Sequence, residues 1–367
     1  MHQGQELDLF HERGSTRLWI GPGAFDRSRA DLGSWLKGRR VFVVTSAPVR
    51  RLHGRRLTAA LEGAVSLVWL EVADGEDGKS LAAVEQVTRE MIEAGGKRDS
   101  RLVTFGGGSV GDVGGFVASC FLRGIEYAHV PTTLLAQVDA SIGGKTGVNL
   151  PQAKNSIGAF HQPRFVVSDS GVLSTLPREQ IRQGLFEVVK AAILADAKLF
   201  ALIEQRLAEL LEGEREALSA AVEAAVAVKV AIVAADEREG DRRRLLNLGH
   251  TLGHALETTV GHGLLAHGDA VGHGMLFAVE LARRRRLADQ DADRMRSLVE
   301  RMEPVALPEL DREKVLEAMG RDKKARESGL SWVLPIRLGA AEVVDGLDPR
   351  DVEPLLASYL TGSVESA

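Results

Sequence analysis

The sequence predicts an α/β protein in which an N-terminal parallel-sheet domain is followed by a mainly α-helical domain. Short apolar runs alternate with helical patterns as far as about residue 170, which is typical of a parallel sheet covered by helices. Beyond that point Ala, Leu, Glu and Arg recur at helical spacing. The length of 367 residues suits two domains, and we place them at residues 1–170 and 171–367.

Apolar runs are expected to form the strands of the first domain, at residues 41–45, 67–72, 102–105, 127–130 and 165–167. Between the second and the third run, residues 81–94 carry apolar side chains at helical spacing, as expected for a helix that covers a sheet. Because strands and helices alternate in this way, we expect a Rossmann-like domain.

The second domain is expected to begin with a helix near Pro177, because Thr175 and Pro177 are residues typical of a helix start. The helical pattern then continues to about residue 302, where the prolines at 304 and 308 interrupt it. Residues 331–338 are expected to form a late strand, in which Pro335 indicates an edge position.

Composition favours a soluble cytoplasmic protein. The chain is 44% hydrophobic and 26% charged, and its formal net charge of -5 disfavours nucleic acid as a partner. The polar N-terminus gives no sign of a signal peptide, and the apolar region 220–235 is broken by Glu223 and Lys229, so we expect no membrane segment. The single cysteine, Cys120, excludes an internal disulfide, and its apolar neighbours predict a buried, inert thiol.

Five polar residues recur at steps of four, three, four and three, which would place them on one face of a helix. This polar row consists of Arg243, Asn247, His250, His254 and Glu257. Most other residues of the segment are Leu, Ala or Gly, so we expect a buried helix whose polar row faces an enclosed cavity. Charged and imidazole groups in a cavity require partners, such as a metal ion or an anionic ligand. The polar row therefore predicts an active site.

A glycine-rich loop follows the strand predicted at 102–105. Gly106, Gly108 and Gly111 have the G-x-G-x-x-G spacing that lets backbone N–H groups approach a pyrophosphate at a helix N-terminus. The same spacing also occurs in plain strand-to-helix turns. The loop is not the first strand turn of a standard dinucleotide fold, because at least two strands are expected before it.

A second cluster combines small hydroxyl residues, glycines and lysines. Gly144-Lys145-Thr146 imitates the end of a P-loop, but Asp139 occupies the position of the first P-loop glycine, which argues against an NTPase. Lysines and hydroxyl groups in a glycine-rich loop still suit a phosphorylated ligand. The cluster comprises Thr132, Thr133, Asp139, Ser141, Gly143, Gly144, Lys145, Thr146, Lys154 and Asn155.

Histidines gather near the polar row, namely His250, His254, His262 and His267, and Glu187 lies on an earlier predicted helix with Lys190 one turn further on. Two imidazoles and a carboxylate leave a zinc ion at least one open position, which is typical of catalytic sites. Scattered histidines more often serve as caps or core hydrogen-bonding groups. For His250 and His267 we favour metal binding, because glycines and polar residues surround them.

Several of these motifs stand in the order found in one enzyme family. They lie at residues 106–112, 131–139, 143–147, 154–160, 187–190, 246–251 and 267–271. Together they closely resemble the 3-dehydroquinate synthases, which belong to the sugar phosphate cyclases. The resemblance extends from about residue 40 to about residue 340. It implies a two-domain enzyme that holds NAD and a divalent metal, zinc or cobalt, between its domains, and that forms a homodimer.

The resemblance also implies roles for individual residues. The metal ligands would be Glu187, His250 and His267. The catalytic and substrate-binding residues would be Arg123, Asp139, Lys145, Asn155, Lys190, Lys229, Arg243, Asn247, His254 and either Lys323 or Lys324. The cofactor would be bound by Glu76, Lys79, Gly107, Gly108, Ser109, Gly111, Asp112, Thr132, Thr133, Asp139, Lys145 and Lys154.

The reaction implied by the resemblance converts 3-deoxy-arabino-heptulosonate 7-phosphate to 3-dehydroquinate and phosphate. It proceeds by transient oxidation with NAD, elimination of phosphate, reduction and internal aldol closure. Three positions depart from the usual family pattern: Ser46 follows Thr45 in place of an acid, Asp269 stands where Glu is more usual, and Ala191-Ala192 replaces a Tyr-Gly pair. None of these changes removes an implied catalytic group.

Two other functions share the expected architecture. A sister cyclase would make an aminocyclitol precursor (2-deoxy-scyllo-inosose) or a valiolone ring from another sugar phosphate, and His254 favours dehydroquinate synthase over the valiolone type. A metal-dependent NAD polyol dehydrogenase would leave several cations, among them Arg123 and Lys229, without a task. An anionic substrate explains these cations better, because burying unpaired charges costs on the order of a few kcal/mol each. An NAD-binding sensor without catalytic activity would need neither the metal set nor the lysines.

Overall fold

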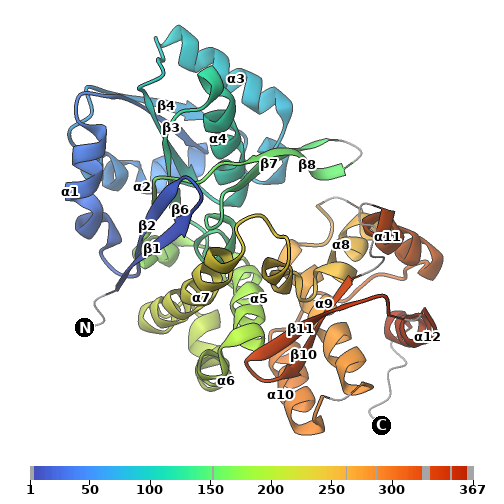
Figure 1. The fold of residues 1–367 in the computed structure, drawn as a ribbon. Helices are drawn as coiled ribbons and strands as arrows, with labels where there is room; N and C mark the ends of the chain where they lie inside the picture. Colours follow the sequence, from blue (N-terminus) through green and yellow to red (C-terminus); the bar gives the residue numbers. More distant parts are fainter. Residues whose placement is uncertain are drawn as a thin grey trace. The chain divides into compact units, whose positions relative to one another are not determined.

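The computed structural model describes residues 4–150, 153–261, 263–285, 287–324, 331–347 and 349–361 (Figure 1). The side chains of residues 321–324 and 349–351 are not among the described parts. The chain forms two compact units, each of which combines two stretches of sequence. Unit 1 contains Met1–Ile181 and Glu209–Arg238, and unit 2 contains Arg182–Ala208 and Glu239–Ala367.

Within the described part of unit 1, seven strands form one sheet in the order β1-β2-β9-β6-β5-β3-β4. All neighbouring strands pair in parallel except β1 and β2, which form an antiparallel hairpin at one edge. The strands are β1 Gln5–His11, β2 Gly14–Ile20, β3 Arg40–Thr45, β4 Ser66–Glu71, β5 Arg101–Gly106, β6 Tyr127–Pro131 and β9 Phe165–Ser168. The five strands predicted from apolar runs are confirmed, and the edge hairpin was not predicted.

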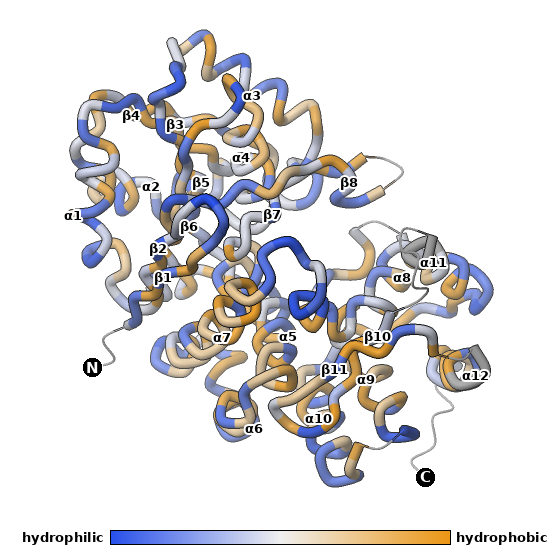
Figure 2. Tube along the Cα trace, in the orientation of Figure 1, coloured by the Kyte–Doolittle hydropathy of each residue, from blue (hydrophilic) through white to orange (hydrophobic). Residues whose placement is uncertain are grey.

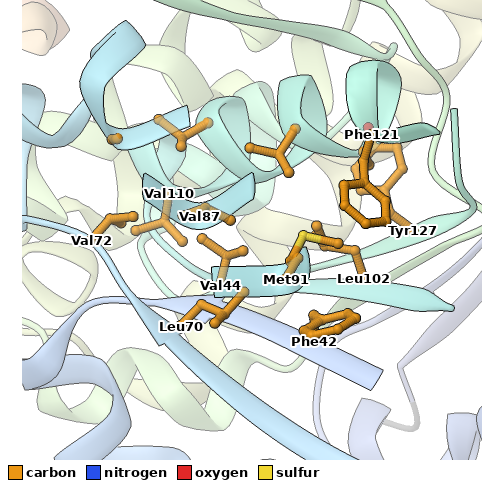
Figure 3. Close-up of a cluster of buried hydrophobic side chains, with 14 of the residues drawn as sticks. Phe42, Val44, Leu70, Val72, Val87, Met91, Leu102, Val110, Phe121 and Tyr127 are labelled. Atoms are coloured by element: carbon orange, nitrogen blue, oxygen red, sulfur yellow. The ribbon is translucent and has the colours of Figure 1, made fainter. Parts of the chain in front are cut away.

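The helices of unit 1 connect and cover these strands. They are α1 Ala24–Leu36, α2 Ala47–Ala60, α3 Leu81–Glu93, α4 Gly108–Cys120 and α7 Arg215–Ala235, with short helical turns η1 Glu76–Gly78, η2 Phe121–Arg123, η3 Ala136–Ala140 and η4 Ser170–Thr175. A second hairpin, β7 Lys145–Leu150 with β8 Ala153–Phe160, follows η3. Figure 3 shows the core between α3, α4 and the sheet, where Val44, Leu102, Val87, Met91 and Val110 pack together.

Helix α7 is long and apolar enough to cross a membrane by length and composition, but 67% of its most apolar stretch is buried in the protein. Figure 2 shows the apolar character of this helix, which contacts β1, η3 and η4 within unit 1. Buried core helices of water-soluble proteins have the same composition. Its burial therefore explains its hydropathy without a membrane.

Unit 2 is mainly helical. It contains most of α5 Arg178–Ala195 and α6 Ala197–Leu211, then η5 Arg242–Asn247, α8 His250–Val260, α9 His267–Arg283, α10 Asp289–Arg301, α11 Arg312–Lys324 and α12 Pro349–Leu360. The helix start predicted near Pro177 is confirmed by α5. The late strand is also confirmed as β10 Ser331–Arg337, and it pairs with an unpredicted strand, β11 Ala340–Asp345. The parallel-sheet unit and the helix-rich unit together confirm the predicted fold class.

Two expectations about single segments are wrong. Cys120 is exposed at the end of α4 rather than buried, because its neighbour Phe121 takes the buried position that ends the helix. The segment from Arg243 to Glu257 is not one helix, because η5 ends at Asn247 and α8 starts at His250. Gly249 between them has a φ of 79°, which an α-helix cannot accommodate.

Candidate active site

Three side chains of unit 2 form a cluster that could hold a metal ion. Glu187 lies in the middle of α5, and His250 and His267 are the first residues of α8 and α9. One ligand atom from each lies within 4.8 Å of the others. Glu187 Oε1 is 3.4 Å from His267 Nε2 and 3.8 Å from His250 Nε2. The three residues that the sequence singled out are thus brought together, and we call them the metal cluster.

Neighbouring groups orient both imidazoles of the metal cluster. His250 Nδ1 lies 3.1 Å from the carbonyl oxygen of Leu248, and since a carbonyl only accepts, Nδ1 carries the proton of that hydrogen bond. Its Nε2 therefore keeps a lone pair on the side of Glu187. His267 Nδ1 lies 3.7 Å from Glu257 Oε2, so its Nε2 also faces Glu187. Metal-binding histidines usually donate their other ring N–H to a carbonyl or carboxylate in this way.

The negative charge of Glu187 is neutralised by a neighbouring lysine of unit 2. Glu187 is only 2% exposed and pairs with the equally buried Lys190. Burial, reinforced by the positive charge of Lys190, lowers the pKa of His250 well below its usual range. Burial would also lower the pKa of His267, but hydrogen bonds and charges from Glu187 and Glu257 outweigh it and raise the pKa to about 10. Positive charge thus surrounds this carboxylate, and a metal ion bound by His267 would displace the proton from its Nε2.

The polar row is divided between two elements. Arg243 and Asn247 lie on η5, whereas His250, His254 and Glu257 lie on α8. The break occurs because α8 packs tightly on α9: a Cβ at Gly249 would lie 2.7 Å from the carbonyl oxygen of Val271, and one at Gly274 would lie 1.8 Å from that of Gly249.

The members of the polar row also differ in exposure. Arg243 is 1% exposed and Glu257 is buried, whereas His254 is exposed. The ring centroid of His254 lies 5.2 Å from that of His250 and 6.3 Å from that of His267. The polar row thus extends from a buried arginine to an exposed histidine beside the metal cluster. The prediction that the row faces an enclosed cavity is correct only for its buried members.

Several polar residues near these groups were not predicted. Glu239 accepts a hydrogen bond of 2.8 Å from Asn247 Nδ2, yet it lies in an irregular charged stretch without any periodicity. Arg182, Gln183 and Asp269 form a further buried network. The position of Gln183 one turn before Glu187 on the same helix was the available signal for that network.

In unit 1 the glycine loop forms the predicted strand-to-helix turn. Strand β5 ends at Gly106, and α4 begins at Gly108. A Cβ at Gly107 would lie 3.2 Å from Thr133 Cγ2, and one at Gly108 would lie 3.3 Å from the Ala140 Cβ, so larger residues would crowd the loop. The Thr132 hydroxyl is buried and has no hydrogen-bond partner among the described residues. Backbone N–H groups at a helix start, next to such a hydroxyl, suit a phosphate-bearing cofactor.

Predicted cofactor residues surround this loop. The Ser109 hydroxyl donates to Glu76 Oε2 over 3.1 Å, and Asn149 Nδ2 donates to Glu76 Oε1 over 2.7 Å.

A buried ion pair lies next to these hydrogen bonds. Lys79 Nζ lies 2.5 Å from Asp112 Oδ2. Burial raises the pKa of Asp112, although the Lys79 charge opposes this. Burial would raise the pKa of Glu76 too, but the Lys79 charge and the Asn149 hydrogen bond bring it below its ordinary value. Gly111, also predicted, packs against His129 beneath the loop.

Among the predicted substrate-binding residues of unit 1, Lys229 on α7 and Asp139 on η3 meet directly. Lys229 Nζ donates to Asp139 Oδ1 over 2.5 Å. Lys145 starts β7 and is exposed. Lys154 and Asn155 lie on β8, where Asn155 has a φ of 53° and its N–H donates to Asn149 Oδ1 over 2.9 Å.

The other predicted substrate-binding residues, Arg123 and the lysines at 323 and 324, lie on η2 and α11. Arg123 is exposed at the end of η2, in the left-handed region with a φ of 72°. Lys323 and Lys324 belong to α11, and their side chains lie outside the described parts, as does His262 entirely.

Each unit thus presents groups that chemistry can use. Unit 2 presents a carboxylate and two imidazoles, a donor set that suits zinc and leaves positions open for a substrate. Unit 1 presents a glycine-rich helix start with charged and hydroxyl groups beside it. A metal-assisted reaction that also uses a phosphate-bearing cofactor would need both sets of groups.

Comparison with known proteins identifies a family. A family model described as the 3-dehydroquinate synthase N-terminal region matches residues 69–183, and the C-terminal model matches residues 184–325. The chain is 44% identical to a 3-dehydroquinate synthase from Geobacter metallireducens over 343 residues, which cover 93% of this chain and 94% of the relative.

Solved structures agree in fold. A 2-epi-5-epi-valiolone synthase from Streptomyces hygroscopicus, solved with NAD+ and Zn2+ bound, is 28% identical with a TM-score of 0.85, covering 95% of this chain and 97% of that one. A 2-deoxy-scyllo-inosose synthase, solved with carbaglucose-6-phosphate, NAD+ and Co2+, has a TM-score of 0.86 at 22% identity, covering 96% of this chain and 99% of that one, and supports the fold alone.

Proposed function

The chain belongs to the 3-dehydroquinate synthase family, and from this we propose that it converts 3-deoxy-arabino-heptulosonate 7-phosphate to 3-dehydroquinate and inorganic phosphate. The observation that carries the proposal is the metal cluster of Glu187, His250 and His267, with Lys190 beside it. Together with the glycine loop of unit 1, it supports a phosphate-eliminating lyase that uses a metal and a nucleotide cofactor.

The metal cluster would hold zinc, or cobalt in its place. Its carboxylate and two oriented Nε2 atoms fit the zinc donor set, and a related cyclase of the same fold binds Zn2+. When bound, zinc supplies Lewis-acid polarisation of hydroxyl oxygens. Leu248 and Glu257 would keep the ligand rings in place, and Lys190 would bring a positive charge to the same position.

The glycine loop would hold NAD. The crowding at Gly107 and Gly108, the unpartnered hydroxyl of Thr132 and the helix start of α4 together fit a pyrophosphate and its sugars. When bound, NAD supplies a reversible hydride acceptor. Glu76 would accept hydrogen bonds from ribose hydroxyls, and the remaining predicted cofactor residues would be Lys79, Ser109, Gly111, Asp112, Thr133, Asp139, Lys145 and Lys154.

The cations would bind the phosphate and carboxylate of the substrate. Arg243 is 1% exposed, and Lys229, which contacts Asp139, is also buried. An anion bound by either side chain would therefore meet a charge that is held largely out of water. Asn247, positioned by Glu239, and the exposed His254 would contact substrate hydroxyls. Lys145, Asn155, Arg123 and Lys324 would complete the set. A phosphorylated substrate offers these cations an ion pair that a neutral polyol does not, which favours a cyclase over a dehydrogenase.

The remaining proposals concern organisation. We place an NAD-binding domain at residues 1–170 and a metal- and substrate-binding domain at residues 171–367. We also propose a homodimer located in the cytoplasm. Their support is the resemblance and the composition of the chain.

The experiment is a measurement of phosphate release by the purified protein from 3-deoxy-arabino-heptulosonate 7-phosphate, with glucose 6-phosphate and a neutral polyol as parallel reactants. The proposal predicts phosphate release from the first compound alone. Release only from glucose 6-phosphate would favour a sister cyclase, and accumulation of NADH with the polyol would establish a dehydrogenase.

A further inference from the structure

Asp269 lies close in sequence to the metal-cluster residue His267 and accepts hydrogen bonds from three residues. It is the third residue of α9, two positions after His267, and it is 1% exposed. Its Oδ1 accepts from Arg182 Nη1 over 2.7 Å and from the Val305 N–H over 2.9 Å. Its Oδ2 accepts from Gln183 Nε2 over 2.5 Å and from Arg182 Nη2 over 3.2 Å. The hydrogen bonds from these donors hold the buried carboxylate in one position.

The contact with Gln183 is reciprocal. While Gln183 Nε2 donates to the Asp269 carboxylate, Gln183 Oε1 accepts from the Asp269 backbone N–H over 3.0 Å. Gly268 makes this approach possible, because a Cβ there would lie 2.4 Å from the Gln183 carbonyl oxygen and 2.5 Å from its Oε1. These paired hydrogen bonds therefore hold the first turn of α9 against one turn of α5, and we call them the α5–α9 contact.

The α5–α9 contact lies on the same two helices as Glu187 and His267 of the metal cluster. Gln183 precedes Glu187 by one helical turn on α5, and Asp269 follows His267 in the first turn of α9. Sliding or rotating one helix against the other would change the separation of Glu187 Oε1 and His267 Nε2, now 3.4 Å, but it would also break the paired hydrogen bonds. Arg182 adds a third segment to the α5–α9 contact, because it donates to the Glu303 carbonyl over 2.7 Å and so holds the chain that follows α10.

We propose that Asp269, held by Arg182 and Gln183, is a positioning residue that sets the separation of the metal ligands Glu187 and His267. This inference rests on the proposed function, because it takes the metal cluster to be occupied. It assigns Asp269 no contact with the metal ion or the substrate. The carboxylate acts through the helix that carries His267.

The test compares Asp269→Asn with the wild-type protein in metal binding rather than in activity. Asparagine keeps the shape but removes the charge and sets an NH2 group against the donors of Arg182 or Gln183. We expect Zn2+ affinity, measured on metal-free protein by competition with a chromophoric chelator, to fall roughly 10-fold to 100-fold. The visible absorption of the Co2+-loaded variant should also differ from the wild-type spectrum, because the ligand geometry changes.

The matched control is Glu204→Gln. Glu204 also forms a two-point pair, with Arg294 at 3.2 and 2.7 Å in unit 2, but it joins α6 to α10 away from the metal ligands. This control should bind Zn2+ as the wild type does. If Asp269→Asn does not fold, Gln183→Met replaces it: it leaves the Arg182 pair intact and should still weaken Zn2+ binding by about 10-fold.

The outcomes are distinct. If the wild type binds Zn2+ and the folded Asp269 or Gln183 variant binds it equally well with an unchanged Co2+ spectrum, the positioning role is wrong and the proposed function stands. If the wild-type protein binds no Zn2+, the metal site of the proposed function fails and the positioning role fails with it.

Discussion

At the scale of single residues, Glu187 is the centre of the metal cluster. It supplies the only carboxylate of that cluster, and Lys190 and both histidines lie around it. We expect Glu187→Gln to retain less than about a tenth of the bound zinc, since an amide is a much poorer ligand than a carboxylate. Metal analysis of the purified variant after dialysis measures this. Full zinc content together with normal activity would show that the assignment of the ligands is wrong.

Arg243 is the most buried cation of the polar row. If it binds the phosphorylated substrate, Arg243→Ala should lower kcat/KM by about 10-fold to 100-fold, because one hydrogen bond to a charged group contributes about 1.5–3 kcal/mol. Steady-state kinetics of phosphate release give the value, and circular dichroism checks that the variant folds. A folded variant with unchanged apparent affinity would mean that the arginine is structural.

His129 predicts a pH dependence for stability that does not involve the metal cluster. Burial beneath the glycine loop lowers its pKa from 6.5 to about 3, and its Nδ1 lies 2.6 Å from the Thr104 hydroxyl. The folded protein thus binds this proton less readily than the unfolded chain. The resulting stability is present above pH 6.5 and is lost as the pH falls toward 3, by up to about 1.4 kcal/mol per pH unit.

Urea unfolding of the wild type and of His129→Gln between these pH values tests the prediction. The variant, which has no titrating imidazole at this position, should lose stability less steeply on acidification. Equal slopes for the two proteins would contradict the depressed pKa.

Residue identity and motif spacing predicted that Glu187, His250 and His267 come together, because His and Glu have few roles in a buried helix. What they could not show was the partner of each group. Glu239 beside Asn247 and Asp269 beside Gln183 come from segments far apart or without periodicity. The exposure of Cys120 was missed for a related reason: apolar neighbours indicate a helix near the core, but not which face of its last turn is covered.

At the scale of elements, the packing of α8 on α9 places His250 next to His267. It depends on Gly249 and Gly274, because a Cβ at position 274 would lie 1.8 Å from the Gly249 carbonyl oxygen. We expect Gly274→Ala to lower the free energy of unfolding by about 3 kcal/mol or more, since backbone atoms must move apart. Urea unfolding of the metal-free protein measures this.

Gly320 offers the matched control. It lies in α11, and a Cβ there would meet nothing within 4 Å. Gly320→Ala should therefore stabilise the protein by about 0.4–1 kcal/mol, because alanine restricts the unfolded chain and favours helix. If both alanines had the same effect, close packing at Gly274 would not be the reason for its glycine.

The same packing explains why the polar row was predicted as one helix. Its spacing of three and four residues continues across Leu248 and Gly249, so periodicity alone shows no interruption. The break is imposed by α9, which requires a left-handed residue at Gly249. The hairpins β1–β2 and β7–β8 were missed for a similar reason: their strands carry mixed polar and apolar residues, and their pairing rather than their pattern makes them strands.

At the scale of the whole molecule, alternation of apolar runs with helical patterns predicted the fold class, because parallel strands are buried on both faces and read as continuous apolar segments. The pattern of apolar and polar residues could not show to which compact unit a helix belongs. Helix α7 follows α6 in sequence but packs with β1, η3 and η4 in unit 1, where its Lys229 meets Asp139. That assignment depends on long-range contacts, which a local pattern does not contain.

We propose that the metal cluster and the glycine loop serve one reaction in which the nucleotide is regenerated. The measurement that tests it most directly is the number of phosphate ions released from 3-deoxy-arabino-heptulosonate 7-phosphate per NAD supplied, with chelated and zinc-reloaded protein and with NADH followed by absorbance. We predict many phosphates per NAD, no net NADH, and loss of release on chelation that zinc restores. Release that is independent of metal and NAD, or NADH formed in proportion to product, would contradict the account.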